Sequence, residues 1–572
     1  MKNSFGLVKI KNVKAKLILL SCLFSIFKSS TAVAQDKDPV TYGKVSVADF
    51  KLPPSKAIDS NASAVIIADV GNTSFVGNKN GWVSYVFKRH TRIKIIDKKG
   101  IDAATIKIRL YKDGDAQEKL DDVQASSYNL VNGAVVQSKL EKKDIFESKI
   151  DKRRIEKKFT LPGVKEDAII EYSYTITSDF YFNIPEWQFQ SIEYPCLWSQ
   201  YEITIPSLVG YVSLRQGIHP FIIDKTSEGQ ASYRIKDKAE GNLANPDRDF
   251  IVNASTYKRV WAMKEIPAFN VENYISTPYN YVDKIEFQLA KTYNGETTRD
   301  VKNTWQKATE ELLHQADFGE PLQPDNSDFA EQVNKIVGNE VGDLEKARKI
   351  YYYVRDNFTC TDFYSKYITT TLTDVFKKKQ GNVGEINLLL AVMLRNARIH
   401  ADPVLLSTTE FGFNSPYYPI MDRLNYVICR VPISSSVYYL DAAKSMLGFG
   451  KLAANCYNGH ARIICEKDSG SVYFRPDSVK DSKLTSVFII NDEKGNGEMS
   501  GAYQSSPGYF ESTLIREKGE KEYFRNMIQN TVDIKIDSPS IDSLKQYDLP
   551  VKIRFGFSYK NNTDQDIIYF SP

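Results

Sequence analysis

Strand signals fill almost the whole first half of the sequence, and this long run constrains the fold more than any other feature. From about Tyr42 to Leu289, aromatic and β-branched residues alternate with polar ones, and turn pairs such as Asn132-Gly133 separate the runs. Alternation at period two is typical of strands that bury one face. The pattern predicts a large antiparallel β domain over residues 35–290, built as a β-sandwich.

The periodicity changes after about Arg299, where apolar residues begin to recur at helical spacing. A polar stretch with Pro321 and Pro324 separates two such stripes. We therefore expect a second, central domain over residues 291–475. The two stripes consist of Trp305, Ala308 and Leu312, and then of Ala347, Ile350, Tyr351, Val354 and Phe358.

Alternation returns from about Asp481, for example at Val551, Ile553 and Phe555. This predicts a smaller C-terminal β domain over residues 476–572. The chain of 572 residues, with 42% hydrophobic content, is long enough for about three or four domains with real cores.

Residues 1–34 have the pattern of a secretory signal peptide. A lysine-rich start precedes an apolar run from Leu17 to Phe27, and Ala32-Val33-Ala34 provides a small-residue cleavage site. Cleavage as a lipoprotein at Cys22 is the less favoured alternative. The run is too short to span a bilayer. We therefore expect secretion across the inner membrane into the periplasm or outer envelope, with no transmembrane segment in the mature chain.

The basic net charge belongs to this leader. Residues 1–34 hold six lysines and no acidic residue, so their removal changes the formal net charge from +4 to −2. Lysine-rich stretches such as 142–154 alternate with acids and are typical of a solvated face. The charge therefore gives no reason to expect a nucleic-acid partner.

Five cysteines follow the leader, an odd number in a compartment that permits disulfides, so at least one is expected to be unpaired within the chain. Cys456, His460 and Cys465 have the residue types of a zinc site, but their spacing matches no standard module and a fourth ligand is missing. We expect no metal and no cofactor.

The segment Gly381-Asn382-Val383-Gly384-Glu385 opens a strongly apolar helical stripe. Asn382 is a good N-cap and Glu385 completes a capping box, so Val383 is expected in the first turn of the helix. In that turn, unpaired backbone N–H groups and the helix dipole would lower the pKa of a thiol. A valine has no proton to lose.

Two regions resemble known families. Residues 159–190, FTLPGVKEDAIIEYSYTITSDFYFNIPEWQFQ, closely resemble the β domain of unknown function that precedes transglutaminase-like cores in many secreted bacterial proteins. Residues 344–465 resemble that papain-related α+β core itself, and Leu394-Arg395-Asn396-Ala397-Arg398-Ile399 follows the family's signature after its catalytic helix. The family usually carries further strands at the end, so the apolar stretch 567–572 suggests a truncated relative.

The resemblance implies a catalytic cysteine at a helix start and a histidine and an aspartate on two following strands. Matched residue by residue, Val383 takes the cysteine position, Asn425 the histidine position and Asp441 the aspartate position. None of the five histidines falls on the strand before Asp441. Because valine cannot attack a carboxamide and asparagine cannot shuttle a proton, no intact catalytic set remains and no transglutaminase or thiol-peptidase activity is expected.

One alternative is a relocated nucleophile. Cys429 lies on the same strand face as Asn425, although such a cysteine is more often a small buried hydrophobe. Tyr417 and Tyr418, in the loop before that strand, are candidate contacts of a groove beside the former active site.

The sequence therefore predicts a non-catalytic transglutaminase-like protein that binds a peptide, a protein or a cell-envelope component. An active cysteine peptidase or acyltransferase that uses a relocated nucleophile, and a purely structural envelope module, are the two alternatives.

Overall fold

The structure is a computed structural model that describes residues 39–560 apart from several short segments. The predicted signal peptide and the apolar stretch 567–572 lie outside the described residues. The segments left out are 151–152, 238–247, 273–274, 294–296, 302–303, 324–327, 468–469, 492–497 and 531–533.

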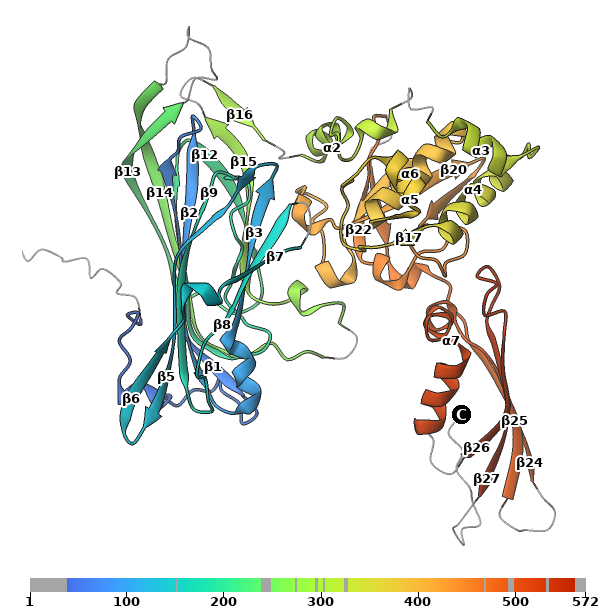
Figure 1. Ribbon diagram of the computed structural model, residues 1–572, viewed down its shortest axis with the longest axis horizontal. Coiled ribbons are helices and arrows are strands. Elements are labelled where there is room, and N and C mark those ends of the chain that lie inside the picture. Colours follow the sequence, from blue (N-terminus) through green and yellow to red (C-terminus); the bar gives the residue numbers. More distant parts are fainter. Residues whose placement is uncertain are drawn as a thin grey trace, which may run out of the picture.

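An eight-stranded sheet forms one layer of the N-terminal domain, shown in blue and green in Figure 1. All of its strand pairs are antiparallel except β1 with β11, which run parallel, so the expected antiparallel pattern has one departure. In sheet order, the strands are β13 (Ile223–Asp237), β14 (Arg248–Ile266), β11 (Cys196–Pro206), β1 (Ala64–Gly77), β2 (Val83–Ile95), β9 (Ile169–Ser178), β5 (Lys119–Val131) and β6 (Ala134–Lys139).

Two smaller sheets share one hydrophobic core with the large sheet, which gives the layered β architecture that alternation predicts. The first contains β10 (Trp187–Gln188), β15 (Lys284–Tyr293), β12 (Val209–Gln216) and β16 (Thr298–Asp300); the second contains β4 (Ala116–Gln117), β3 (Thr105–Asp113), β8 (Arg154–Thr160) and β7 (Phe146–Lys149).

Strand β3 shows how the alternation of apolar and polar residues decides which face of a strand is buried. Ile106, Ile108 and Leu110 are buried in the core, whereas Lys107 and Arg109 between them are exposed. Because successive side chains of a strand point to opposite faces, the outer face of β3 is polar. Figure 1 shows β3 and β7 on the side of the β domain that faces the central domain.

The central domain wraps helices around a five-stranded sheet (Figure 1). Its sheet order is β21 (Ser436–Leu440), β20 (Tyr426–Ile433), β19 (Asp402–Leu406), β22 (Gly459–Ile463) and β23 (Ser471–Phe474). The helices are α2 (Trp305–Leu313), α3 (Ala330–Val337), α4 (Asp343–Asn357), α5 (Leu372–Lys378) and α6 (Val383–Asn396), with a short parallel pair formed by β17 (Thr359–Cys360) and β18 (Gln380–Gly381).

Helix α6 is the centre of this domain. Every residue from Val383 to Leu394 is buried, and the helix packs against strand β20 and helices α3, α4 and α5. A helix that is apolar around its whole circumference requires such complete burial. The start of α6 is therefore held on all sides by other parts of the chain.

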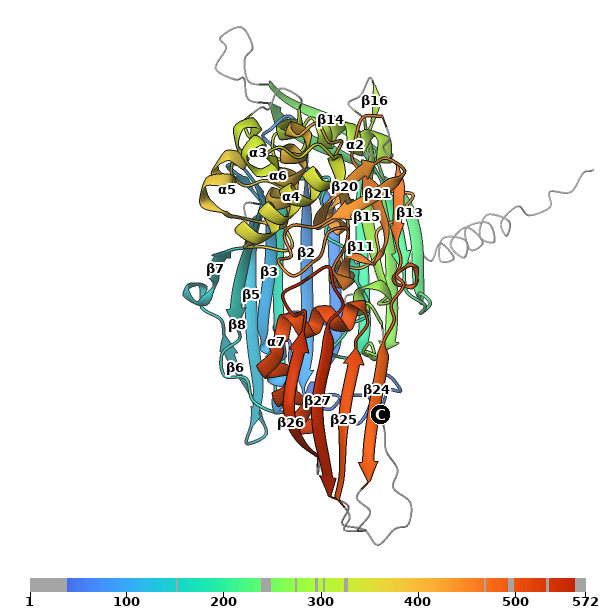
Figure 2. The ribbon, with the colours of Figure 1, turned by 90° about the vertical axis from the view of Figure 1, so that its right-hand side faces the viewer.

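The C-terminal module places α7 (Tyr509–Asn530) against a four-stranded antiparallel sheet (Figure 2). Non-helical backbone at Gly519, with φ of 76°, interrupts α7. The sheet order is β24 (Leu484–Asn491), β25 (Glu498–Ser506), β27 (Lys552–Lys560) and β26 (Ile534–Asp542).

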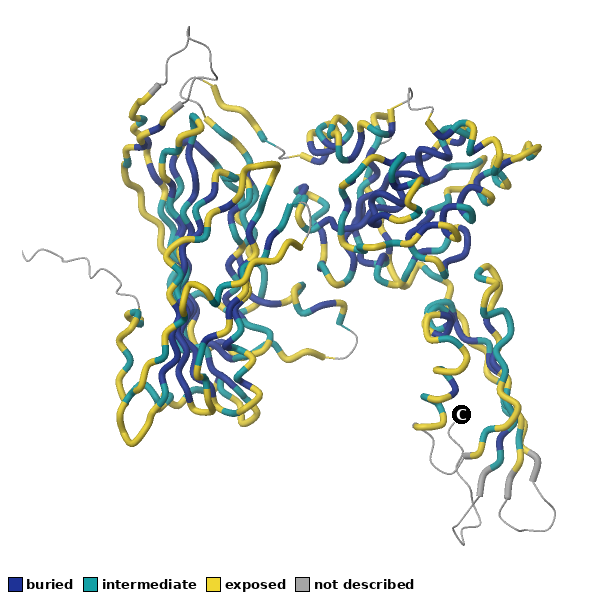
Figure 3. The backbone as a smooth tube through the Cα atoms, viewed as in Figure 1, coloured by how far each residue is buried: buried dark blue, intermediate teal, exposed yellow. Residues whose placement is uncertain are grey.

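Burial is densest around α6 and between the β sheets, as the dark blue segments of Figure 3 show. Within the described residues, no helix has the length and apolar character needed to cross a membrane.

Candidate functional site

The start of α6 is built by local capping signals. The Asn382 carboxamide accepts a hydrogen bond from the Glu385 backbone N–H at 2.8 Å, and the Glu385 carboxylate accepts one from the Asn382 backbone N–H at 2.8 Å. This confirms the capping box expected from the sequence and begins the helix at Val383. The Glu385 carboxylate also accepts bonds from the Thr369 N–H and hydroxyl, at 2.7 Å each.

The first-turn N–H groups of α6 are all engaged. The Val383 N–H donates to the Asp362 carbonyl at 2.9 Å, and the Gly384 N–H donates to the Ser365 carbonyl at 3.1 Å. Helix N-termini otherwise leave such donors available for anions. The Val383 side chain is also fully buried. The start of α6 is therefore covered by a loop of the same chain, and it offers no free N–H donor to an oxyanion.

A tyrosine, an aspartate and an asparagine form a closed network beside Val383's helix. The Tyr426 hydroxyl donates to Asp441 Oδ2 at 2.8 Å, and Asn387 Nδ2 donates to Asp441 Oδ1 at 2.9 Å. Asn387 Oδ1 accepts from the Ala442 N–H at 2.8 Å, so the network also fixes the backbone after β21. All three network side chains are at most 1% exposed. The network is therefore part of the core.

The structure does not bring Asn425 to Asp441. Asn425 Oδ1 accepts from the Thr408 N–H at 2.9 Å, and its Nδ2 donates to the Thr408 hydroxyl at 3.1 Å. The residue on this strand that contacts Asp441 is the next one, Tyr426. Successive side chains of a strand face opposite sides, so Asn425 and Tyr426 point in different directions, and Asn425 as the former histidine position stays a prediction.

Burial governs the ionisation of this network. Desolvation raises the pKa of Asp441 above its ordinary value, against the opposing effect of hydrogen bonds from Asn387 and Tyr426. Desolvation, followed by the neighbouring Asp441 charge, raises the pKa of Tyr426 well above 10. Tyr426 therefore carries its proton at neutral pH and has no capacity to act as a general base there.

The cysteines are shielded in the same way. Burial raises the pKa of the Cys429 and Cys456 thiols well above 9 and that of Cys360 to about 12. Cys429 is fully buried between strands. Reactive cysteines need the opposite environment, exposed and electropositive, so these thiols lack the features of a nucleophile. Among the described residues, no three or more His, Cys, Asp or Glu side chains are grouped to hold a metal ion.

A cavity of about 630 Å³ lies between the β domain and the central domain. Its β-domain wall includes Arg109, Tyr111 and Arg154 on the outer face of β3 and β8. Its other wall is the segment Tyr364–Thr369, the same segment that covers the start of α6, together with residues near Asp422. The volume is within the range of sites for small ligands.

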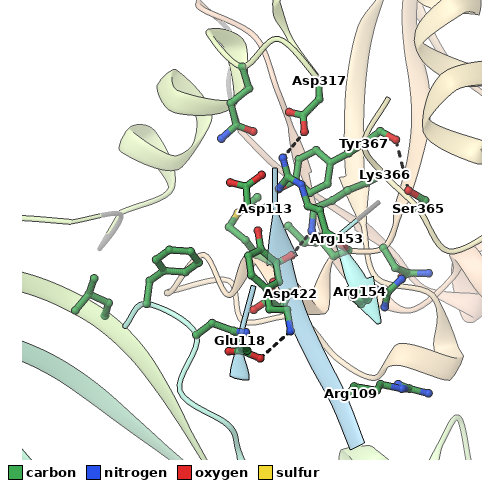
Figure 4. A pocket seen from close by; sticks show the side chains of 18 of the residues that line it. Arg109, Asp113, Glu118, Arg153, Arg154, Asp317, Ser365, Lys366, Tyr367 and Asp422 are labelled. Atoms are coloured by element: carbon green, nitrogen blue, oxygen red, sulfur yellow. Dashed lines mark hydrogen bonds and ion pairs between the residues drawn. The ribbon is translucent and has the colours of Figure 1, made fainter. Parts of the chain in front are cut away.

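The cavity lining is rich in charge and aromatic rings (Figure 4). One ion pair crosses it: the Arg153 guanidinium donates to the Asp317 carboxylate and lies 4.2 Å from the centroid of the Tyr367 ring. Asn425 lines the cavity, whereas Tyr417 and Tyr418 do not. Tyr417 is 80% exposed, and a ligand contact for these two tyrosines stays a prediction.

Two parts of the chain match protein-family models. Residues 330–410 match the transglutaminase-like superfamily, and residues 83–238 match DUF3857, a domain of unknown function with a solved structure. These matches confirm the two resemblances expected from the sequence. The chain is thus a multidomain α+β protein in which a large N-terminal β domain precedes a transglutaminase-like core.

Solved structures offer a distant comparison. A putative protease from Parabacteroides distasonis has a TM-score of 0.49 and 11% identity, over 87% of this chain and 94% of that one. An M1 zinc metallopeptidase from Deinococcus radiodurans has a TM-score of 0.16 and 8% identity, over 45% of this chain and 49% of that one. Among curated proteins, none is significantly similar to this chain.

Replacement of Gly384 by alanine tests the tight cover over α6. A Cβ at this position lies 2.4 Å from the Lys366 carbonyl oxygen, so the loop has to move. We expect Gly384→Ala to lower the free energy of unfolding by about 1–3 kcal/mol, measured by urea denaturation. Gly342→Ala is the control, because its Cβ has no neighbour nearer than a glutamate oxygen at 4.0 Å. Equal stability of the two variants would contradict the close approach.

Replacement of Asp441 by asparagine tests the buried carboxyl. Because the pKa of Asp441 is higher in the folded state than the unfolded value of about 3.9, the folded state binds this proton more tightly, and its contribution to stability is lost as pH rises through the folded pKa. We expect the unfolding free energy of the wild type, relative to Asp441→Asn, to fall with rising pH above 4, by at most about 1.4 kcal/mol per pH unit.

Urea midpoints measured from pH 4 to 8 for both proteins give this difference. The exposed Asp115 provides a matched control, because Asp115→Asn should leave the pH profile of the wild type unchanged. Profiles of wild type and Asp441→Asn that run parallel over the whole range would be incompatible with a raised pKa at Asp441.

Proposed function

We propose that this protein is a non-catalytic transglutaminase-like protein that is exported across the inner membrane and binds a peptide, a protein or a cell-envelope component. The observation that carries the non-catalytic part is the closed start of α6. There a valine occupies the nucleophile position, and backbone carbonyls of Asp362 and Ser365 take the N–H groups of the first turn.

Acyl transfer by a cysteine enzyme needs three things: a thiolate, a proton acceptor beside it, and donors for the oxyanion. Val383 supplies no thiol. The tyrosine that contacts Asp441 keeps its proton at neutral pH because burial raises its pKa. The donors of the helix start are engaged by the chain itself. In a serine protease the loss of the nucleophile alone costs about a million-fold in turnover.

A relocated nucleophile is the alternative that retains catalysis. Cys429, the candidate on β20, has a fully buried side chain with a raised pKa. Deprotonation of such a thiol is unfavourable, and no solvent path reaches its sulfur for a substrate. These properties favour the non-catalytic proposal over the relocated nucleophile.

The interdomain cavity supports ligand binding over a purely structural role. The former catalytic centre beside Tyr426 is filled by core side chains, which alone would favour a structural module. The cavity, however, is a concave space lined by charged and aromatic side chains from both domains. A concave space with aromatic walls and a few polar groups is typical of ligand sites.

The proposal of export is based on the lysine-rich, apolar leader over residues 1–34. We place the mature protein in the periplasm or outer envelope. Peptides, proteins and envelope components are all available to it there.

The proposal predicts no acyl transfer. Incubation of the protein with a glutamine-containing peptide and a fluorescent primary amine should give no amide product above background, and incubation with the peptide alone should give no cleavage, because no thiolate faces a bound carbonyl. Chromatography with mass detection checks both. Product that disappears in Cys429→Ser or Cys360→Ser would show that a relocated nucleophile operates and that the proposal is wrong.

Iodoacetamide labelling at neutral pH gives an independent readout. The native thiols of Cys429 and Cys456 should react much more slowly than the same thiols in urea-unfolded protein, because burial keeps them protonated and inaccessible. Labelling of either site in the native protein as fast as in the unfolded protein would contradict the buried geometry.

A further inference from the structure

His460 lies beneath two elements that form part of the interdomain cavity wall. It belongs to β22, and its ring centroid is 5.2 Å from that of Trp305, at the start of α2. Its Nδ1 accepts a hydrogen bond from Asn414 Nδ2 at 3.3 Å, and Asn414 belongs to the 407–425 loop between β19 and β20. Figure 1 shows α2 on the side of the central domain that is nearer the β domain. With 5% of the residue exposed, His460 is buried under both elements.

Both elements line the cavity. Helix α2 contributes Ala308 and Leu312 to the lining, and the 407–425 loop contributes Asp422. Shortly after α2, Asp317 forms the ion pair with Arg153 of the β domain. A change in how α2 and this loop pack on β22 therefore reaches both the cavity and the contact between the two domains.

The groups that face His460 favour its neutral form. Arg462 is the next residue on the same face of β22, and Tyr473 of β23 packs edge-on with ring centroids 5.5 Å apart. Trp305 and the amide of Asn414 cover the ring from the other side. Among the described residues, no carboxylate forms an ion pair with His460, and the charge that acts on it is that of Arg462. Burial and this like charge lower the pKa of His460 to about 4.

The hydrogen bonds of the ring also fit a neutral imidazole. Because Nδ1 accepts a bond from the Asn414 amide, the proton is on Nε2, which lies 3.0 Å from Ser471 Oγ. A second proton, on Nδ1, would point at the N–H group of the amide. Rotation of the amide would remove this clash. The imidazolium would still be buried beside Arg462, with no carboxylate partner in the described part of the chain.

The packing around His460 is also rich in polar atoms that the protein does not pair. Asn458, two residues before His460, holds the 407–425 loop through its Nδ2, which donates to three of the loop's backbone carbonyls. Unpaired buried polar atoms weaken the packing around them. The contact of α2 and the loop with β22 is therefore less firmly held than the apolar packing of α6. The atoms without a hydrogen-bond partner in the described residues are Trp305 Nε1, Asn414 Oδ1, Asn458 Oδ1 and Arg462 Nε.

We infer that His460 is an acid-sensitive latch of the interdomain cavity: protonation of its ring releases α2 and the 407–425 loop from β22 and loosens the cavity wall that they form. The neutral ring fits between Trp305, Asn414 and Tyr473. The charged ring is more stable in water, so it favours the released state. The latch concerns the docking of α2 and holds for the protein without a ligand.

The direction of the pH dependence follows from the two states of His460. In the released state the ring titrates near its ordinary pKa of about 6.5, and in the docked state its pKa is about 4. The docked state is therefore fully favoured above pH 6.5 and loses stability as the pH falls towards 4. Between pH 7 and pH 5, the equilibrium constant for release should rise about twentyfold.

Hydrogen exchange of the full chain, followed by mass spectrometry, measures this release. Rates are compared at pH 7 and pH 5 after correction for the intrinsic pH dependence of exchange. In the wild type, peptides from α2 and the 407–425 loop should lose protection about twentyfold, whereas peptides from α6 should keep theirs. In His460→Gln, which has a neutral polar side chain at all these pH values, the protection of α2 should vary little with pH.

His314→Gln is the matched control, because His314 is exposed at the end of the same helix. This variant should respond to pH like the wild type. Titration of the histidine ring signals by NMR adds a second measurement, with the His460 signal assigned by its absence in His460→Gln. The His460 signal should stay constant from pH 7.5 to 5.5, whereas an exposed histidine titrates in this range.

Three results would each overturn the latch. The first is an equal pH response of α2 in the wild type and in His460→Gln. The second is loss of protection in α6 together with α2, which would show general acid unfolding. The third is titration of His460 near pH 6.5 without a change in the protection of α2. This last result comes from the wild type when its ring signals are followed together with hydrogen exchange, so the inference stays testable even where His460→Gln does not fold.

Discussion

The loop from Asp362 to Thr370 lies over the first turn of α6, and the rest of the central domain depends on this contact. Its carbonyls accept hydrogen bonds from the first-turn N–H groups, and the Glu385 carboxylate accepts a hydrogen bond from the Thr369 N–H of the loop. Lys366 fastens it to the segment before β20 through the Leu424 carbonyl. The absence of a side chain at Gly384 lets the two backbones approach. Several separate interactions therefore hold this loop in position over the start of α6.

The same loop has two faces with different roles. Its inner face closes the helix end, where an oxyanion would need free donors. Its outer face, through Tyr364–Thr369, forms one wall of the interdomain cavity. The closure of one site thus provides the rigid wall of the other, and rigid walls lower the entropic cost of binding a ligand. The covered start of α6 and the proposed binding site therefore share one loop.

Local signals made the start of α6 predictable. Asn382 and Glu385 specify its cap within four residues, and alternation correctly indicated the β domains. The residue that contacts Asp441 was harder to predict, because Asn425 and Tyr426 are adjacent at the start of a strand. Only the pairing of β20 with β19 and β21 decides which of these two side chains points toward α6. Asn387, a lone amide in an apolar helix, is the sequence signal that indicates a buried polar partner beside α6. The cavity was beyond sequence reasoning, since Tyr111 and Asp422 are far apart in the chain.

The bond from the Val383 N–H to the Asp362 carbonyl also determines what a single substitution at this position can change. A cysteine introduced at position 383 would still sit beneath the loop, with its amide engaged and with Tyr426 in place of a base. A substitution at this single position therefore leaves the cover over the helix start in place.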